Sequence, residues 1–213
     1  MKIIYYGHAC FAFISKEGTT VITDPYTKVG YELPSDLSAD VVTTSHGHFD
    51  HNYTQAVKAK RIVSQAGRFQ VNEVEIIGDN SYHDQEQGRL RGNNIFFKYN
   101  IDGMRLCHLG DLGESISSEI ISRIGIVDVL FIPVGGTYTL DGTQAKDYAR
   151  AIGAKVVIPM HYKPQDGALD ITSAKPFLQY FEGNVTNALD GVIEISADNL
   201  PKSQQVIYME RKK

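Results

Sequence analysis

The six residues His46-Gly47-His48-Phe49-Asp50-His51 are the most informative stretch of this 213-residue sequence, and only Ser45 separates them from a β-branched segment at 40–44. Three imidazoles and one carboxylate supply the nitrogen and oxygen ligands that zinc and similar divalent ions prefer. On a loop that leaves a strand, residues two apart can face one ion, while the last two residues of the run turn towards a second. The glycine lets the backbone bend tightly. The alternative is a surface histidine cluster without a fixed metal, and the buried strand predicted in front of the run argues against it.

Further ligands must come from other segments, because one loop cannot complete a site for two ions. Three candidates each lie just past a predicted strand: Asp111 after 104–108, His161 after 155–158, and His83 a short loop after 74–77. Residues at strand ends often only form turns, so each candidate alone is a weak signal. Together they match what a site along one edge of two sheets requires.

The pattern of apolar residues predicts strands throughout the first half and strand–helix alternation in the second half. The predicted strands are 2–6, 10–15, 19–23, 40–44, 61–64, 74–77, 94–99, 104–108, 127–132, 155–158, 192–195 and 205–209. The predicted helices are 115–124, 143–152 and 173–181. Two sheets packed face to face with helices outside satisfy this α+β pattern. We expect a single domain over 1–213.

The overall composition limits the classes of partner. The formal net charge is −4, which argues against nucleic acid as the main partner, since phosphate binding needs a basic face. Cys10 and Cys107 are the two cysteines, too few for a disulfide framework, so we expect a reducing cytoplasm. We see no signal peptide and no apolar run of the roughly 20 residues that a membrane span needs.

The order of these candidate ligands resembles that of the metallo-β-lactamase superfamily. More narrowly, the chain is similar to the small single-domain branch of metal-dependent hydrolases that is akin to the ascorbate-6-phosphate lactonases. The match covers nearly the whole chain and includes Gly7-His8-Ala9-Cys10-Phe11, Thr23-Asp24-Pro25, Arg91-Gly92-Asn93-Asn94, Cys107-His108-Leu109-Gly110-Asp111, Pro133-Val134-Gly135-Gly136-Thr137 and Pro159-Met160-His161-Tyr162.

The resemblance implies a four-layer αββα sandwich with a site for two metal ions at one edge. Carried over by position, the ligands of the first ion would be His46, His48 and His83, those of the second ion would be Asp50, His51 and His161, and Asp111 would bridge the two ions. Asp24 would hold the ligand loop by hydrogen bonds without touching a metal.

Two other histidines leave alternatives open. His108 lies three residues before Asp111 and competes with His83 as a ligand of the first ion. We favour His83, since a ligand on a loop can adjust to the metal whereas one inside a strand cannot. His8 follows a strand and a glycine, and it is either a wall of the pocket, a support for the ligands, or a structural histidine.

Substrate contacts are the least determined part of the sequence. Lys163 and Arg91 lie near the ligand motifs and could hold a negatively charged group, although solvated surface charge is the usual role of such residues. A small-molecule substrate is expected, and the oligomeric state is not determined by any motif.

These observations predict a hydrolase in which two divalent ions, zinc first and manganese, nickel or iron as alternatives, hold a hydroxide. Asp50 or Asp111 would orient the hydroxide and pass its proton to the leaving group of a small ester, lactone or phosphodiester. Superfamily nucleases add a clamp domain for which this chain has no room. The rival from another class is a mononuclear non-haem iron oxygenase, which needs only two histidines and one carboxylate. A non-catalytic metal-binding module is the third possibility.

Overall fold

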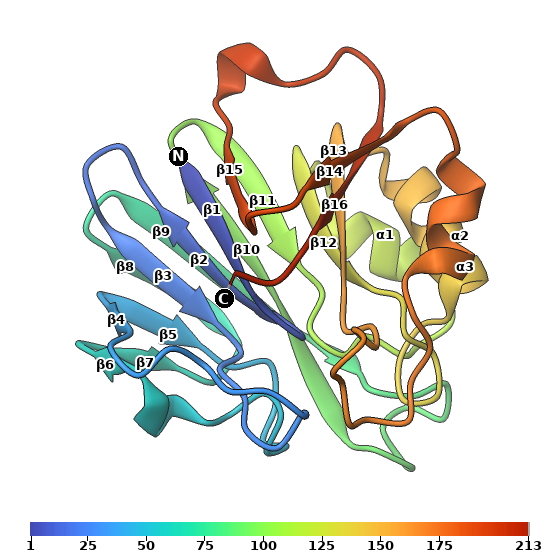
Figure 1. Ribbon diagram of the computed structural model, residues 1–213, viewed down its shortest axis with the longest axis horizontal. Coiled ribbons are helices and arrows are strands. Elements are labelled where there is room, and N and C mark those ends of the chain that lie inside the picture. Colours follow the sequence, from blue (N-terminus) through green and yellow to red (C-terminus); the bar gives the residue numbers. More distant parts are fainter. Residues whose placement is uncertain (213) are drawn as a thin grey trace.

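Two β-sheets lie face to face in the computed structural model, which describes residues 1–212 (Figure 1). The six-stranded sheet has the order β15-β1-β2-β3-β5-β7, and the eight-stranded sheet has the order β14-β16-β13-β12-β11-β10-β9-β8. The strands of the first sheet are β1 (Lys2–Gly7), β2 (Cys10–Ile14), β3 (Thr20–Thr23), β5 (Val41–Thr43), β7 (Ile62–Val63) and β15 (Val192–Glu194). Those of the second are β8 (Gly67–Val71), β9 (Val74–Tyr82), β10 (Asn93–Ile101), β11 (Met104–His108), β12 (Val129–Pro133), β13 (Val156–Met160), β14 (Val185–Ala188) and β16 (Gln205–Met209). The two sheets of the predicted α+β sandwich are therefore present.

Aromatic side chains join the two sheets in the main core. Phe11 and Phe13 of β2 both contact Phe131 of β12, with ring centroids 4.7 and 4.9 Å apart. Phe13 also packs on Tyr99 of β10 at 5.2 Å. Each of these side chains is fully buried. Replacing one such phenylalanine by alanine typically costs about 3–5 kcal/mol, so this layer holds the sheets at a fixed separation.

Three helices cover the outer face of the eight-stranded sheet, beside β12 and β13 (Figure 1). They are α1 (Ser118–Ile124), α2 (Gly142–Ile152) and α3 (Lys175–Leu178). Asp141 caps α2 in a capping box with Gln144, and Gly153 ends the helix with a left-handed φ of 68°. α2 buries Ala145 and Tyr148 against the core.

Irregular stretches before and after β5 cover the outer face of the six-stranded sheet. Ile4, Ala12 and Val42 alternate with the residues of the main core and point to this second face, as the twofold period of a strand requires. The side chains that cover them come from 26–39 and from Val57. These stretches include the 3-10 turn η1 (Thr54–Ala56) and the short strands β4 (Ser38–Ala39) and β6 (Lys58–Ala59). In the described part of the chain this outer layer contains no α-helix.

Several predicted elements differ from those in the structure. β9 extends to Tyr82, well beyond the predicted strand 74–77, so His83 directly follows a strand. The predicted helix 173–181 is divided between α3 and the 3-10 turn η2 (Gln179–Phe181). The sequence pattern also missed β8, whose residues are mostly exposed at the edge of the sheet. An edge strand has weak alternation because it buries little on either face.

Within residues 1–212, no helix has both the length and the hydropathy needed to cross a membrane.

Candidate metal centre

Five chain segments meet at one edge of the two sheets. They carry His8 in the turn between β1 and β2, the ligand run after β5, His83 after β9, Asp111 after β11 and His161 after β13. The backbone N–H of His161 donates to the carbonyl of His8 at 2.8 Å, which joins two of these segments directly. His8, Asp24 and His161 have positive φ angles of 54°, 38° and 51°. Each such non-glycine residue stores about 1–3 kcal/mol of strain, a feature that concentrates at functional sites.

The first group of candidate ligands comprises His46, His48 and His83, whose ligand atoms all lie within 4.8 Å of one another. Nε2 of His46 lies 3.0 Å from Nδ1 of His48. His83 is buried, whereas His48 is exposed at the opening of the site. The structure therefore brings together the three histidines that the resemblance assigns to one ion.

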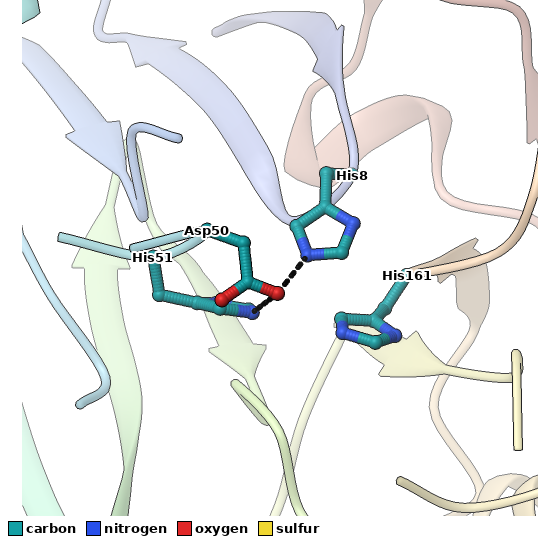
Figure 2. A group of neighbouring side chains, drawn as sticks. All are labelled: His8, Asp50, His51 and His161. Carbon is teal, nitrogen blue, oxygen red and sulfur yellow. Dashed lines mark hydrogen bonds and ion pairs between the residues drawn. The ribbon is translucent and has the colours of Figure 1, made fainter. Parts of the chain in front are cut away.

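The second group comprises Asp50, His51 and His161, as the resemblance implies, and also His8 (Figure 2). Nε2 of His8 lies 3.2 Å from Oδ2 of Asp50, and the ring of His8 is 4.1 Å from the ring of His161, centroid to centroid. His8 is thus within the ligand cluster itself. It comes from a turn that lies far from the ligand loop in the sequence.

Asp111 lies between the two groups. One carboxylate oxygen, Oδ1, is 3.1 Å from Nε2 of His51, and the other, Oδ2, is 3.1 Å from Nε2 of His83 and 3.3 Å from Nε2 of His161. Among residues 1–212, Oδ1 of Asp111, Nε2 of His51 and Nε2 of His161 are buried without a hydrogen-bond partner. Buried nitrogen and oxygen atoms that face one another without hydrogen-bond geometry are a costly arrangement that a divalent cation relieves. The residues present therefore fit a metal centre.

Asp24 holds the ligand loop in place. Its Oδ1 accepts the backbone N–H of Ser45 at 2.7 Å, and its Oδ2 accepts from the hydroxyl of Ser45 at 2.6 Å and from Nδ1 of His51 at 2.9 Å. The hydrogen bond from Nδ1 leaves Nε2 of His51 to face the site, which is how a carboxylate orients a ligating histidine. The hydroxyl of Ser45 also lies 3.0 Å from Nδ1 of His46 and orients that ring in the same way. Asp24 occupies the supporting position that the resemblance implies, and the role of Ser45 was not predicted.

Asn94 fixes the loop that carries Asp111. Its side-chain oxygen accepts the backbone N–H of Asp111 at 2.9 Å, and its amide nitrogen donates to the carbonyl of Leu109 and to the hydroxyl of Ser81. Gly110, with a φ of 56°, has no room for a side chain, because a Cβ there would lie 2.5 Å from the Asn94 oxygen. The sequence showed Asn94 only as part of a motif. Its role depends on the pairing of β9 with β10.

His108 points away from the ligand groups. Its Nε2 donates to the carbonyl of Ala9 at 2.9 Å, and its Nδ1 accepts the backbone N–H of Gly110 at 3.2 Å. Both ring nitrogens are therefore occupied, and burial lowers the pKa of His108, which favours the neutral ring that this pairing requires. Of the two competing histidines, the structure places His83, and not His108, beside His46 and His48.

Residues 2–161 match the family described as the β-lactamase superfamily domain. The chain belongs to the metallo-β-lactamase superfamily. A protein of Thermoplasma acidophilum named as a UPF0173 metal-dependent hydrolase is 28% identical over an alignment of 193 residues, and the match covers 78% of this chain and 85% of that protein. A solved structure from Thermotoga maritima, described as a candidate Zn-dependent hydrolase of the superfamily, is 37% identical, covers 98% of both chains and has a TM-score of 0.81. A di-iron β-hydroxylase of Streptomyces venezuelae, 16% identical with a TM-score of 0.56 over 75% of this chain and 44% of its own, shares the fold alone.

Burial lowers the pKa of three histidines at this superfamily site, His8, His46 and His48, which favours their neutral form. Burial, followed by the charge of His51, lowers the pKa of His46 to about 3, and burial, followed by His161, lowers that of His8 to about 4. His51 is the exception. Burial would lower its pKa, but the carboxylates of Asp111 and Asp24 outweigh burial and raise it well above its usual value. Because a metal ligand must be unprotonated, ion binding at His51 would release a proton.

A pocket of about 440 Å³ opens onto the metal centre of this superfamily member. Its walls combine four candidate ligands with four apolar side chains and one cation: His48, Asp50, His83, Asp111, Phe49, Leu90, Tyr138, Leu169 and Arg91. Of the two predicted anion-binding residues, Arg91 therefore lines the opening. Lys163 is exposed and is not part of this lining.

Proposed function

We propose that this metal-dependent hydrolase holds two divalent ions, one at each histidine group, with Asp111 as the bridging ligand. The observation that carries the proposal is the position of Asp111. Its two oxygens lie at equal distances, 3.1 Å, from a histidine of the second group and a histidine of the first group. A buried carboxylate that faces imidazoles of both groups is suited to serve both ions. The mixed nitrogen and oxygen ligands favour zinc, with manganese, nickel or iron as alternatives.

The ions would supply Lewis-acid chemistry and lower the pKa of bound water towards about 7, so that a hydroxide is present at neutral pH. The two carboxylates of the site then take different roles. Asp111 is almost completely buried among imidazoles and acts as a ligand. Asp50 also lines the pocket, and its side chain is 13% exposed, so it is open to water and to a molecule bound in the pocket.

Asp50 is ionised and therefore available to accept a hydrogen bond from water. Burial would raise its pKa, but the hydrogen bond from His8 and the charge of His51 outweigh burial and lower it, which keeps the carboxylate ionised. A positioned carboxylate of this kind can take a proton from water and pass it to the oxygen that leaves. The products of such a reaction are those of hydrolysis of a small ester, a lactone or a phosphodiester.

Two rival functions make different experimental predictions. A mononuclear iron oxygenase would hold one ion and consume oxygen, and a non-catalytic module would bind metal without turning over any substrate. The presence of a second complete ligand group beside the first supports two ions over one. The opening of the pocket onto Asp50 and Asp111 supports catalysis over simple storage.

The test combines metal analysis with a substrate screen. The purified protein, reconstituted with zinc, should contain about two ions per chain and hydrolyse at least one member of a panel of esters, lactones and phosphodiesters. A double variant, His46→Ala with His48→Ala, serves as the matched control and should lose the first ion and the activity. One ion per chain together with oxygen consumption by the iron-loaded protein would overturn the proposal.

A further inference from the structure

Large apolar side chains gather around the opening of the metal centre although they are exposed to water. Phe49, Leu90 and Tyr138 are 51%, 65% and 39% exposed, and all three line the pocket that contains Asp111. Leu169 completes the apolar wall. Scattered exposed apolar residues need no explanation, but a group around a concave site indicates contact with an apolar ligand.

Arg91 is the cation in this lining, and no carboxylate neutralises it. None of the ion pairs formed within residues 1–212 includes Arg91. One guanidinium N–H group donates to the carbonyl of Thr137 at 3.0 Å, and the guanidinium lies 5.7 Å from the ring centroid of Tyr138. These contacts hold the side chain at the opening and leave other N–H donors available. Arg89 in the same loop differs, since it pairs with Glu86 at 2.8 Å and does not line the pocket.

Asp84 makes this side of the opening rigid. Its Oδ2 accepts the backbone N–H groups of Leu90 and Arg91 at 2.9 and 2.8 Å, while its Oδ1 accepts those of Glu86 and Gly88. One buried carboxylate therefore holds the apolar residue and the cation next to each other in the loop. Such preorganisation reduces the entropic cost of ordering the loop when a ligand binds.

We propose that the substrate is amphiphilic: it carries one anionic group that Arg91 binds and an acyl or aryl group that Phe49 and Leu90 contact, with the hydrolysable bond at the metal centre. This inference rests on the proposed function for the position of that bond. A guanidinium without an ion-pair partner can form two parallel hydrogen bonds with a carboxylate or phosphate. Burial of a hydrocarbon group against the apolar wall would add to the binding free energy. The pocket of about 440 Å³ limits the substrate to a small molecule.

The kinetic test uses four esters that release the same leaving group. They are 4-nitrophenyl butanoate, 4-nitrophenyl octanoate, and the mono-4-nitrophenyl esters of succinate and suberate, so that chain length and charge vary independently. The zinc-loaded protein should have its highest kcat/KM for the suberate ester. Arg91→Gln should reduce kcat/KM for each anionic ester about tenfold more than for the neutral ester of similar length, as expected for a lost charge-assisted hydrogen bond.

Matched control variants distinguish the pocket from the general surface. Arg89→Gln changes the same charge in the same loop and should leave the preference for anionic esters unchanged. Leu90→Ser should reduce the preference for long over short esters about fivefold, since apolar contacts of this size discriminate by such factors. Ile126→Ser is the control for Leu90→Ser, because Ile126 is 73% exposed and lies outside this pocket. Equal effects of Arg91→Gln and Arg89→Gln, or no preference for the anionic esters, would overturn the inference.

A binding measurement tests the amphiphilic ligand if none of the four esters is hydrolysed. Phenylacetate, acetate and phenylacetamide are titrated into the zinc-loaded protein by calorimetry. Phenylacetate should bind most tightly, and Arg91→Gln should weaken it about tenfold, whereas a carboxylate held by the metal alone would be insensitive to that change. Retained binding without hydrolysis would contradict the proposed function and support the amphiphilic ligand. Hydrolysis that does not depend on Arg91 would support the proposed function and contradict the amphiphilic substrate.

Discussion

The imidazole of His8 donates a hydrogen bond from Nε2 to Oδ2 of Asp50, 3.2 Å away, across 42 residues of sequence. The backbone carbonyl of His8 is itself held by two hydrogen bonds, one from the N–H of His161 and one from the hydroxyl of Tyr5. The hydrogen bond thus connects a strained turn to the carboxylate that we assign to proton transfer. It also places the nitrogen of His8 among the candidate ligands of the second ion.

Replacing His8 should weaken the second ion position and leave the first intact. His8→Asn is the suitable change, because asparagine tolerates the positive φ of 54° found there. Loss of a residue that supports a ligand typically lowers metal affinity about 10–100-fold. Competition for zinc against a chromophoric chelator measures both positions. Two wild-type affinities in the variant would show that His8 only fills space.

Asp111→Asn should damage both ion positions together. The amide has the same shape as the carboxylate, and the backbone of residue 111 keeps its hydrogen bond to Asn94. Only the charge and one oxygen ligand are removed, so the fold should be retained. Metal content by mass spectrometry should fall at both positions. If one ion remains at full occupancy, Asp111 is a terminal ligand of the other.

His83→Ala and His108→Ala should have opposite effects on metal content and stability. His83→Ala should empty the first position. His108→Ala should keep the metals but leave the carbonyl of Ala9 and the N–H of Gly110 without partners, at a cost of about 1–3 kcal/mol in the free energy of unfolding. Metal analysis and urea unfolding on the same samples compare the two. Loss of metal in a fully stable His108 variant would reverse the assignment.

Asp84→Asn should destabilise the protein in a pH-dependent manner. Burial would raise the pKa of Asp84, but the backbone N–H donors of Arg91, Glu86, Gly88 and Leu90 outweigh burial and lower it. Because the native pKa lies below the unfolded value of about 3.9, the carboxylate contributes stability above that pH and loses it as pH falls through the native pKa.

Urea unfolding with a chelator present should therefore show a gap of about 1–3 kcal/mol between wild type and Asp84→Asn at pH 7. The gap should narrow below about pH 4, because the carboxyl of the unfolded wild-type chain gains its proton there and that of the folded chain follows only at its lower native pKa. Asp79→Asn is the matched control, since Asp79 is partly exposed, lies outside the loop of Asp84 and pairs with Arg123. A constant gap across this pH range would show that the loop does not depend on the charge of Asp84.

The fold could be predicted where the strands are well buried and regular. Strands such as β1 and β2 were predicted almost to the residue, because their apolar side chains alternate between two packed faces. β8 and β14 were missed, since both are edge strands with largely exposed residues. The outer layer of the six-stranded sheet could not be predicted either, because it has neither a helical period nor a strand period.

The sequence by itself determined the chemistry of the site. The run from His46 to His51 presents its ligands on one short loop, where spacing alone limits their geometry, and it is specific enough to indicate the superfamily. The later candidates Asp111 and His161 were found because each follows a buried strand, and strand ends meet at the edge of a sheet.

Only the tertiary structure decided which other residues join them. His83 and His108 were competing candidates in the sequence, but the pairing of β10 with β11 directs His108 to the carbonyl of Ala9, while His83, directly after β9, lies beside His46. Ser45, Asn94 and Asp84 acquired their roles in the same way, through hydrogen bonds to backbone groups. Lys163 and Arg91 were equal candidates until the loop held by Asp84 placed Arg91 at the opening. The physical reason is that the type of a side chain determines which ions it can bind. The direction in which that side chain points, and the residues it contacts, depend on strand register and on packing between segments far apart in the chain.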